Sequence, residues 1–456
     1  MVSVTIVTWN SAKYLGACFR SLAGQDYSQL EVVIVDNASE DGTREILKLV
    51  DPRWRVIYNS ENVGFAAGQN QAIRASHGEW VLCLNPDVVL SPDFLTQLVA
   101  VGGTHPEAGS LCGKLLRWGP SPQGVEQPFR AASCGGEEVG WEMRSTTSSP
   151  DRTAGDDTRR GPEGPLYPDL KGHGFQPCHQ SPQTAPLGSE GQLLQRLKPD
   201  SPSGLTGTPE GVPLQDTAVQ GATPQKDIAE KLSETGANPR RTNIIDSTGI
   251  YFTRNMRHLD RGAEEIDRGQ YDRLQYVFGA SGAAAFFRRD FIEDVSVEGE
   301  FFDEEFFAFR EDGDLAWRAQ LMGWKCLYVP TAVAWHVRRV TPERRRDLPL
   351  VINWHSAKNR FLMRGKNASG WLCRRLFFPV LWRDIMTFGY ALVRDPRLWS
   401  AVTYPWRARA SVRRKRTIIQ SRRRVSDRDL LWWFSNTPRA RDAVASDRSP
   451  LSRGGN

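Results

Sequence analysis

Apolar and polar positions alternate in a regular way over residues 1–118. Short runs of apolar and β-branched residues, typical of buried strands, alternate with segments whose apolar residues recur at three- and four-residue steps, as in helices. The predicted strands cover residues 2–8, 31–36, 54–58 and 80–84, and the predicted helices cover 12–22, 43–49 and 65–76. Strands and helices in this order form βαβ units. The pattern therefore predicts an α/β fold, with a Rossmann-like, mostly parallel central sheet flanked by helices.

This regular pattern stops between residues 119 and 242, where Pro, Gly, Ser, Thr and Gln dominate and apolar residues are isolated. Such a segment cannot bury enough apolar surface to offset its conformational entropy. We therefore predict a long disordered insertion. His173, Cys178 and His179 lie close together within it, but no second pair of ligands completes a zinc site. We interpret these three residues as incidental parts of a loop.

Patterned sequence resumes at residue 243 and continues to residue 340. Strands are predicted within 243–252, 277–287 and 324–329, and a helix over 311–322. Since residues 1–118 and 243–340 both carry strands and helices, we predict that the two ranges build one folded domain around the insertion.

The region 341–434 is basic and rich in aromatic residues. Between Arg338 and Arg424, Lys and Arg number 23 against four acidic residues. Five apolar residues recur here at three- and four-residue steps and form one stripe of a predicted helix: Phe378, Leu381, Ile385, Phe388 and Leu392. A membrane-spanning helix would bury Arg383 and Asp384, so an amphipathic helix lying on an anionic membrane surface is favoured.

Basic and aromatic residues also alternate in proteins that bind nucleic acid. We consider nucleic-acid binding the weaker alternative for the C-terminal region.

The cysteines and the start of the chain indicate the cellular compartment. The seven cysteines include no Cys-x-x-Cys pair, which favours reduced thiols over a disulfide framework or a zinc site. The chain starts with a strand-like run and no charged leader, so we expect a cytoplasmic protein at the inner face of the membrane. Residues 435–456 are predicted to be a disordered tail.

Polar side chains lie where the predicted strands of the N-terminal half end. Thr8 and Asn10 lie at the end of the first strand, Asp36 and Asn37 at the end of the second, and Asp87 after the fourth. The carboxyl ends of parallel strands share one edge of a sheet, where open α/β folds bind ligands. Asp36 is suited to accept from a ribose hydroxyl or a base N–H, with a helix cap as the alternative role. Asp87 offers the hard carboxylate oxygen that Mg²⁺ or Mn²⁺ prefers.

The loop 62–70 enters a predicted helix and contains Gly64 and Asn70. Glycine allows the backbone to approach a ligand closely, and a helix N-terminus favours an anion such as a phosphate. On its own, this loop is weak evidence for a phosphate site.

A dense group of acidic and aromatic residues lies at 302–318. Glu311 and Asp312 open a predicted helix, where the helix macrodipole keeps a carboxylate deprotonated. A deprotonated carboxylate beside an acceptor hydroxyl is what a general base requires, and a helix cap is the alternative role. His336 follows a predicted strand, and it is either a structural side chain or an extra ligand of a cation bound to a diphosphate.

Six segments that carry these residues occur in order: 4–11, 35–43, 62–70, 84–87, 279–283, and 302–318 followed by Gly323 and Trp324. Together they resemble a family 2 glycosyltransferase of the GT-A fold, in the bacterial rhamnosyltransferase-like branch. By this resemblance, residues 1–118 form the nucleotide-sugar-binding half of the domain, and residues 243–340 form its acceptor and catalytic half. The insertion at 119–242 is not part of the family pattern.

The resemblance implies an inverting, divalent-metal-dependent transfer of a sugar from a nucleotide-diphosphate donor, with dTDP-rhamnose as the leading donor. The implied acceptor is a saccharide or a polyprenyl-diphosphate-linked acceptor in cell-surface polysaccharide synthesis. Residues 85–87, Asn-Pro-Asp, stand where the family has its Asp-x-Asp metal motif, which leaves Asp87 as the principal ligand of Mg²⁺ or Mn²⁺. By the same resemblance, Asp36 binds the base or ribose, and Thr8 and Asn70 bind the nucleotide.

On the acceptor side, the resemblance makes Asp312 the base, with Glu311 as its alternative, and adds Gly282, Asp303 and Glu304. Two other function classes stay open. A catalytically silent, nucleotide-sugar-binding scaffold of a polysaccharide assembly complex would not need a metal carboxylate together with a base. A nucleotidyltransferase would carry a Gly-rich, basic phosphate loop close to the N-terminus, and the sequence there has no such glycines.

Overall fold

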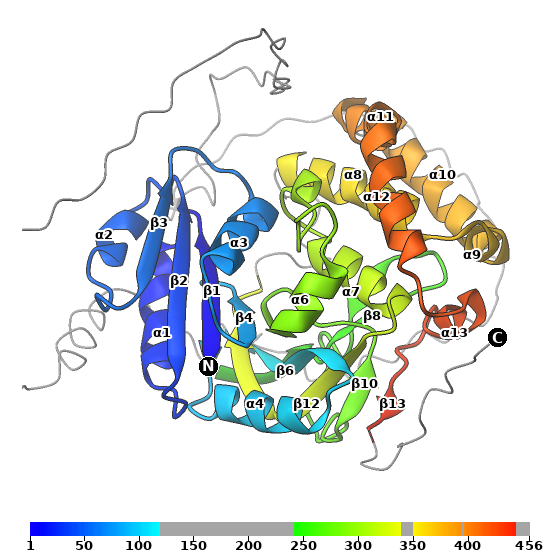
Figure 1. Cartoon of the computed structure of the whole chain (residues 1–456). Helices are drawn as coiled ribbons and strands as arrows, with labels where there is room; N and C mark the ends of the chain where they lie inside the picture. Colours follow the sequence, from blue (N-terminus) through cyan, green and yellow to red (C-terminus); the bar gives the residue numbers. More distant parts are fainter. Residues whose placement is uncertain (119–240, 339–349, 394–395, 444–456) are drawn as a thin grey trace, which may run out of the picture. The chain divides into compact units, whose positions relative to one another are not determined.

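Strands and helices alternate along the N-terminal half of the chain (Figure 1). The computed structural model describes residues 1–118, 241–338, 350–393 and 396–443, and all of them belong to one compact unit. The first elements, in chain order, are β1 (Val2–Thr8), α1 (Ala12–Ala23), β2 (Leu30–Asn37), α2 (Thr43–Leu47), β3 (Arg55–Asn59), α3 (Phe65–Arg74) and β4 (Trp80–Leu84). The predicted elements of this half are confirmed, with ends that differ by one or two residues.

Mostly strands follow, with fewer helices between them. The next elements are β5 (Val88–Leu90), α4 (Phe94–Thr104), β6 (Ala108–Trp118), β7 (Arg241–Ser247), β8 (Ile250–Phe252), β9 (His258–Asp260), β10 (Gln275–Val277), β11 (Ala284–Arg288), α6 (Arg289–Val295), the 3-10 helix η1 (Glu304–Phe306), α7 (Glu311–Leu321) and β12 (Lys325–His336). The predicted insertion at 119–242 lies outside the described residues, except that residues 241 and 242 begin β7 because this strand pairs with β6. β12 is longer than predicted and includes His336 as its last residue.

The strands form one mixed sheet in the order β13-β10-β12-β6-β11-β4-β1-β2-β3, with β5 on β12 and β7 on β6. β1 pairs in parallel with β2 and β4, and β2 with β3, because helices supply the crossovers between them. β6 and β12 are also parallel, whereas β11 is antiparallel to both β4 and β6. Residues 241–288 contain no helix, and antiparallel strands need none. The α/β prediction is confirmed, but predominantly parallel pairing is confined to the N-terminal half.

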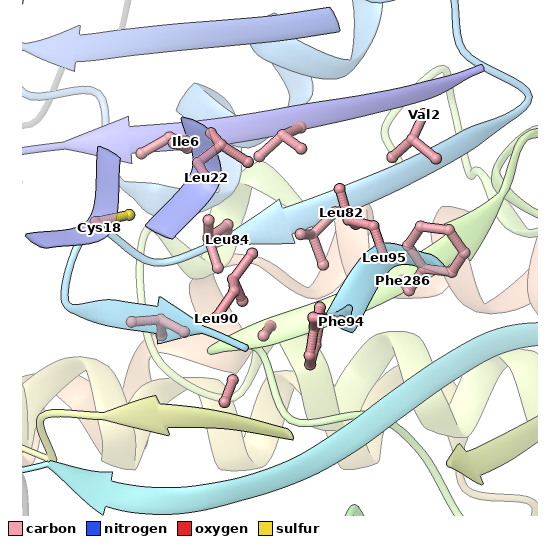
Figure 2. Close-up of a cluster of buried hydrophobic side chains, with 14 of the residues drawn as sticks. Val2, Ile6, Cys18, Leu22, Leu82, Leu84, Leu90, Phe94, Leu95 and Phe286 are labelled. Carbon is pink, nitrogen blue, oxygen red and sulfur yellow. The ribbon is translucent and has the colours of Figure 1, made fainter. Parts of the chain in front are cut away.

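A large apolar cluster holds the N-terminal strands in place. Figure 2 shows side chains of β1, α1, β4, β5, α4 and β11 meeting in this cluster; the residues labelled are Val2, Ile6, Cys18, Leu22, Leu82, Leu84, Leu90, Phe94, Leu95 and Phe286. All seven residues of β1 are buried, as expected for a central strand covered on both faces. Full burial of each large side chain contributes about 1.5–3 kcal/mol. The cluster thereby fixes the strand ends that carry the polar residues.

The basic C-terminal region is helical, as predicted. Its elements are α8 (Leu350–Asn367), α9 (Gly370–Arg375), α10 (Phe377–Val393), η3 (Pro396–Leu398), α11 (Trp399–Arg407), α12 (Arg409–Ser421), α13 (Asp427–Trp432) and β13 (Arg441–Asp442). In the ranges that the structure describes, none of the helices combines the length and the apolar content that a bilayer crossing requires.

The predicted disordered tail is wrong for residues 435–443. The Ser435 N–H donates to the Phe252 carbonyl at 2.9 Å, and β13 pairs with β10. Phe434 is buried and packs on Phe252 with ring centroids 5.5 Å apart. This aromatic contact carries the following residues onto the edge of the sheet.

Candidate active site

The end of β2 carries a fully buried carboxylate with several partners. Asp36 accepts hydrogen bonds from the Thr8 hydroxyl at 3.0 Å, the Ser39 backbone N–H at 3.2 Å and the Arg44 guanidinium at 2.7 Å. A buried carboxylate is costly unless such partners compensate for lost hydration. Thr8 and Asp36 therefore form one locally satisfied group at the ends of β1 and β2.

Gly64 lies next to this group and connects it with the acidic segment. The Asn37 amide donates to the Gly64 carbonyl at 3.0 Å. Gly64 has a φ of +88°, and an added Cβ would lie 2.6 Å from the Phe307 ring, so glycine is required there. The Ala66 N–H donates to the Phe307 carbonyl at 3.1 Å. Asn10 is less central, since its side-chain oxygen accepts from the Glu40 N–H at 2.9 Å and closes the turn after β2.

Asp87 and His336 face each other across the β5–β12 pair. The Nε2 atom of His336 lies 3.5 Å from Oδ1 of Asp87, and Nδ1 lies 2.8 Å from Oδ2 of Asp246. Burial alone would lower the pKa of His336, but the charges of Asp246 and Asp87 outweigh it and raise that pKa to about 10. The ring is therefore protonated at neutral pH, and it would bind a cation only after losing the proton on Nε2. The Asp246 contact at Nδ1 is of the kind that orients histidine ligands of metals.

The Asp87–His336 pair fits a cation that protein and ligand would bind together better than a cation bound by protein side chains alone. Among the described residues, no group of three His, Cys, Asp or Glu side chains could hold a metal ion. Two neighbouring ligands on an octahedral ion with bonds of about 2.1 Å are about 3 Å apart, close to the separation of the Asp87 and His336 atoms. Mg²⁺ commonly takes one or two protein ligands and leaves its other positions to phosphates and water. Asp87 and His336 therefore fit an ion that a diphosphate would complete.

The acidic pair Glu311 and Asp312 opens α7, as predicted. Asp312 accepts from the Gly282 N–H at 3.2 Å and the Gly313 N–H at 2.7 Å, and its Oδ1 lies 3.6 Å from Nε2 of His258. Burial raises the pKa of Asp312, and the two backbone N–H groups oppose that rise. Gly282, which is predicted on the acceptor side, thus contacts Asp312 through its backbone N–H.

Glu311 differs from its neighbour. Burial, and then the negative charge of Asp312, raise the pKa of Glu311 to about 8. Within the described residues, its Oε2 atom is buried and has no hydrogen-bond partner. When the environments of two adjacent carboxyl groups differ in this way, their pKa values differ, and one group can be protonated while the other is ionised. Glu311 is the member that stays protonated at neutral pH, and Asp312 is the member whose hydrogen bonds stabilise the anion.

A row of polar side chains leads from one end of the site toward the other. His336 contacts Asp246, and Arg338 donates to Asp246 at 3.1 Å and to Asp260. Asp260 and His258 are two residues apart on β9 and therefore share one face of the strand. His258 lies 3.6 Å from Asp312. Polar contacts therefore connect Asp87 with Asp260, and the shared face of β9 places His258 and Asp312 near that end of the row.

Asp246, His258 and Arg338 were not predicted as site residues. They come from β7, from β9 and from the residues after β12, and each is a single polar side chain with no motif around it. Asp246 approaches His336 because β7 pairs with β6, and this pairing joins segments far apart in the sequence. No local signal in the sequence carries that information.

Three other predicted residues make contacts within the protein. Asn70 donates to the Phe302 carbonyl at 2.7 Å and to Glu304 at 3.0 Å, which fastens α3 to the acidic segment. Asp303 is buried and pairs with Lys366 and with Lys415, the latter at 2.7 Å. Burial acts to raise the pKa of Asp303, but the charges of Lys366 and Lys415 outweigh it and lower that pKa. These contacts stabilise the fold around the acidic segment, and the acceptor-side role of Asp303 and Glu304 stays a prediction.

Comparison with known proteins concerns the family of the chain. The family model "Glycosyl transferase family 2" matches residues 3–117. An N-acetylglucosaminyltransferase of Bradyrhizobium sp. (strain ANU 289) is 37% identical over 103 residues, which cover 21% of this chain and 67% of that protein. An N-acetylglucosaminyltransferase of Bradyrhizobium elkanii is 38% identical over 109 residues, which cover 22% of this chain and 58% of that protein.

Other similarities cover less of the relative or are more distant. The putative colanic acid biosynthesis glycosyl transferase WcaA of Escherichia coli (strain K12) is 33% identical over 103 residues, and the chain spans 37% of its length. The crystal structure of S. aureus TarS 1-349 matches with 16% identity and a TM-score of 0.40, over 92% of this chain and 90% of that one. The predicted rhamnosyltransferase branch stays a prediction. The family model and the Bradyrhizobium relatives show that the chain belongs to glycosyl transferase family 2.

Proposed function

We propose that this protein transfers a sugar from a nucleotide-diphosphate donor to an acceptor hydroxyl, with inversion of configuration, in cell-surface polysaccharide synthesis. One observation carries the proposal. Asp312, held by two backbone N–H groups, and the Asp87–His336 pair lie at the two ends of a row of polar side chains formed by Asp246, Arg338, Asp260 and His258. A base and a metal carboxylate at two ends of one site are what a metal-dependent inverting transferase needs.

The chemistry follows from the positions of these groups. Asp312 removes the proton of the acceptor hydroxyl while that oxygen attacks the anomeric carbon from the face opposite the leaving diphosphate, so one displacement inverts the configuration. The Gly282 and Gly313 N–H groups keep the Asp312 carboxylate oriented for the proton. Asp87 and His336 would hold Mg²⁺ or Mn²⁺, and the bound cation would neutralise charge on the leaving diphosphate. General-base catalysis of this kind contributes about 10²–10⁴-fold.

The donor sugar is the finer part of the proposal. The sequence resemblance favours dTDP-rhamnose, and the names of the Bradyrhizobium relatives make UDP-N-acetylglucosamine the second candidate. The structure describes no residue whose chemistry separates these two sugars. We keep dTDP-rhamnose as the first donor to test and include UDP- and GDP-sugars beside it.

The test is a donor screen on the purified chain with Mn²⁺ or Mg²⁺, scored by thermal unfolding. A ligand that binds the native state raises stability by mass action, about 2.7 kcal/mol at a hundred times its Kd. We expect one nucleotide class to raise the unfolding temperature, and we expect chelator or Asp87→Ala to abolish the rise. A shift without turnover on any acceptor would favour the silent scaffold, and release of inorganic diphosphate would favour a nucleotidyltransferase.

The exposed face of α10 supports an anionic membrane surface as the location of the acceptor. The large apolar side chains that this helix exposes are Phe377, Phe378, Leu381, Trp382, Ile385, Met386, Tyr390, Leu392 and Val393. Phe378 and Trp382 are 80% and 67% exposed, and the exposed Arg374 and Arg375 precede them. An apolar face next to basic side chains matches the chemistry of an anionic bilayer, and a polyprenyl-diphosphate-linked acceptor would be presented there.

Two residues of α10 face away from the exposed apolar side chains, and one of them, Phe388, was predicted to lie in the apolar stripe. Phe388 does not belong to the exposed face, because its ring packs against Phe361, with centroids 5.7 Å apart. Asp384 is turned toward α8, where it pairs with Arg360 at 3.1 Å and Arg364 at 2.7 Å. These pairs keep the one acidic residue of α10 away from the proposed lipid surface.

Vesicle sedimentation tests this surface. The full chain should pellet with phosphatidylserine-containing vesicles and much less with phosphatidylcholine vesicles. The double variant Phe378→Ser and Trp382→Ser should lose this binding, whereas Leu49→Ser, at a 47% exposed apolar residue outside the C-terminal region, should keep it. Equal binding of the double variant and the wild type would contradict the proposal.

A further inference from the structure

The backbone just before the acidic pair is strained. Phe307, Phe309 and Arg310 have positive φ values of 64°, 71° and 71°, which side chains other than glycine rarely adopt. Such a strained backbone conformation persists only where surrounding contacts over-determine it. Glu311 and Asp312 follow immediately, so the backbone conformation of residues 307–310 determines where these two acidic side chains lie.

The contacts that hold this segment come from α8. Asn359 is fully buried, and its amide nitrogen donates to the carbonyl groups of Phe306, Ala308 and Phe309 at 2.9, 2.8 and 2.7 Å. An amide has two hydrogens, so three acceptors at these distances require one hydrogen to be shared. The neighbouring Lys358 donates to the Glu305 carbonyl at 2.6 Å.

Two further residues of α8 contact the same segment through side chains. Arg310 donates to the Ser356 carbonyl at 2.8 Å and to its hydroxyl at 3.2 Å. The His355 ring stacks on the Phe307 ring, with centroids 4.8 Å apart and planes 17° apart. Burial and the charge of Lys358 lower the pKa of His355 to about 4, so a neutral ring makes this stack.

α8 is itself anchored on both sides of these contacts. The pairs from Arg360 and Arg364 to Asp384 tie it to α10, and Asn367 near its end donates to Asp314 of α7 at 2.7 Å. A helix fixed to two other helices is a rigid platform for a strained segment.

We propose that α8 is a positioning element of the active site and that Asn359 is its principal positioning residue, acting through residues 306–310 on Glu311 and Asp312. The inference rests on the proposed function for its catalytic consequence. Its structural part, that Asn359 holds residues 306–310 in their strained conformation, is independent of which sugar is transferred.

The test compares Asn359→Leu with Gln25→Leu, since Gln25 also holds backbone through its side-chain amide, donating to the Ser21 and Ser91 carbonyls at 3.0 and 2.7 Å. In Asn359→Leu, we expect kcat to fall at least tenfold. The donor-induced thermal shift should stay, and the acid limb of the kcat/KM pH profile should move. Gln25→Leu should lower the unfolding temperature and keep kcat within about threefold. Asn359→Gln, which retains the amide, should recover part of the lost turnover.

Hydrogen exchange separates failure of the inference from failure of the proposed function. Backbone amides of residues 306–312 should exchange faster in Asn359→Leu than in Gln25→Leu, whether or not the wild type turns over a nucleotide sugar. Unchanged exchange at these amides would overturn the inference. So would a loss of turnover that follows the unfolding temperature equally in both variants.

Discussion

Asp36 at the end of β2 and Asp312 at the start of α7 are both enclosed carboxylates, but the protein compensates them differently. Asp36 accepts from a guanidinium, a hydroxyl and a backbone N–H. Asp312 accepts from two backbone N–H groups and lies beside His258, and burial raises its pKa. Asp36 is thus fixed by a cation, whereas Asp312 is held by neutral N–H donors, and a carboxylate whose pKa burial raises is suited to accept a proton. The comparison therefore supports the proposal that Asp36 organises the donor end and that Asp312 is the base.

The strongest way to break this comparison is to neutralise each carboxylate in turn. Asp312→Asn should lower kcat by about 10²–10⁴-fold, because the base is removed while its shape is kept. Donor-induced thermal stabilisation should survive in this variant. Asp36→Asn should instead weaken that stabilisation more than it lowers kcat at saturating donor. Steady-state kinetics and thermal shift on the same preparations measure both, and unchanged turnover in Asp312→Asn would remove it from the base role.

Asp303, in the same acidic segment as Asp312, is a third kind of carboxylate, because two buried lysines compensate its charge. Asp303 lies between Lys366 and Lys415, all of them nearly inaccessible to solvent. Asp303→Asn leaves two buried cations with less compensation and should cost about 3–5 kcal/mol of unfolding free energy. Urea unfolding measures this loss. A cost below about 1 kcal/mol would mean that Asp303 is not the hub of this ion-pair cluster.

The Arg44 guanidinium, which pairs with Asp36 at the donor end, should contribute less to the free energy of unfolding than Asp303 does. Arg44→Ala removes one charged partner of Asp36 but leaves Thr8 and Ser39, and the Arg44 side chain is 38% exposed. We expect a loss of about 1 kcal/mol after allowing for solvent screening. Arg53→Ala, which breaks an exposed pair with Asp51, is the matched control and should change the unfolding free energy less. Equal losses in the two variants would show that the Arg44 pair has no special role.

The last expected effect is a change in the slope of stability with pH. The folded-state pKa of Glu311 is raised from 4.5 to about 8, so the folded protein holds a proton that the unfolded chain releases above about pH 4.5. Stability from this group is therefore present at low pH and is lost as pH rises toward 8. Glu311→Gln should flatten this part of the stability profile. Urea unfolding at a series of pH values checks it, and identical profiles for variant and wild type would contradict the raised pKa.

How far the sequence predicts this molecule differs between its two halves. The alternation over residues 1–118 predicts the strands, because each is a short apolar run bounded by turn residues. The Glu311–Asp312 helix start and the Asp87 position are predictable from local motifs. The roles of Asp246, His258 and Asn359 depend on pairings between segments far apart in the chain, which no local pattern encodes. Asp303 has the same acidic surroundings in sequence as Asp312, and the partners that distinguish it lie more than 60 residues later.

The central claim is that Asp312 drives a single displacement on a nucleotide-bound sugar. The most direct measurement is the anomeric configuration of the product, read by proton NMR during the reaction with the donor identified in the screen. A product whose anomeric configuration is opposite to that of the donor is the result that the mechanism predicts. A product that keeps the donor configuration would contradict it, because one base and one displacement cannot retain configuration.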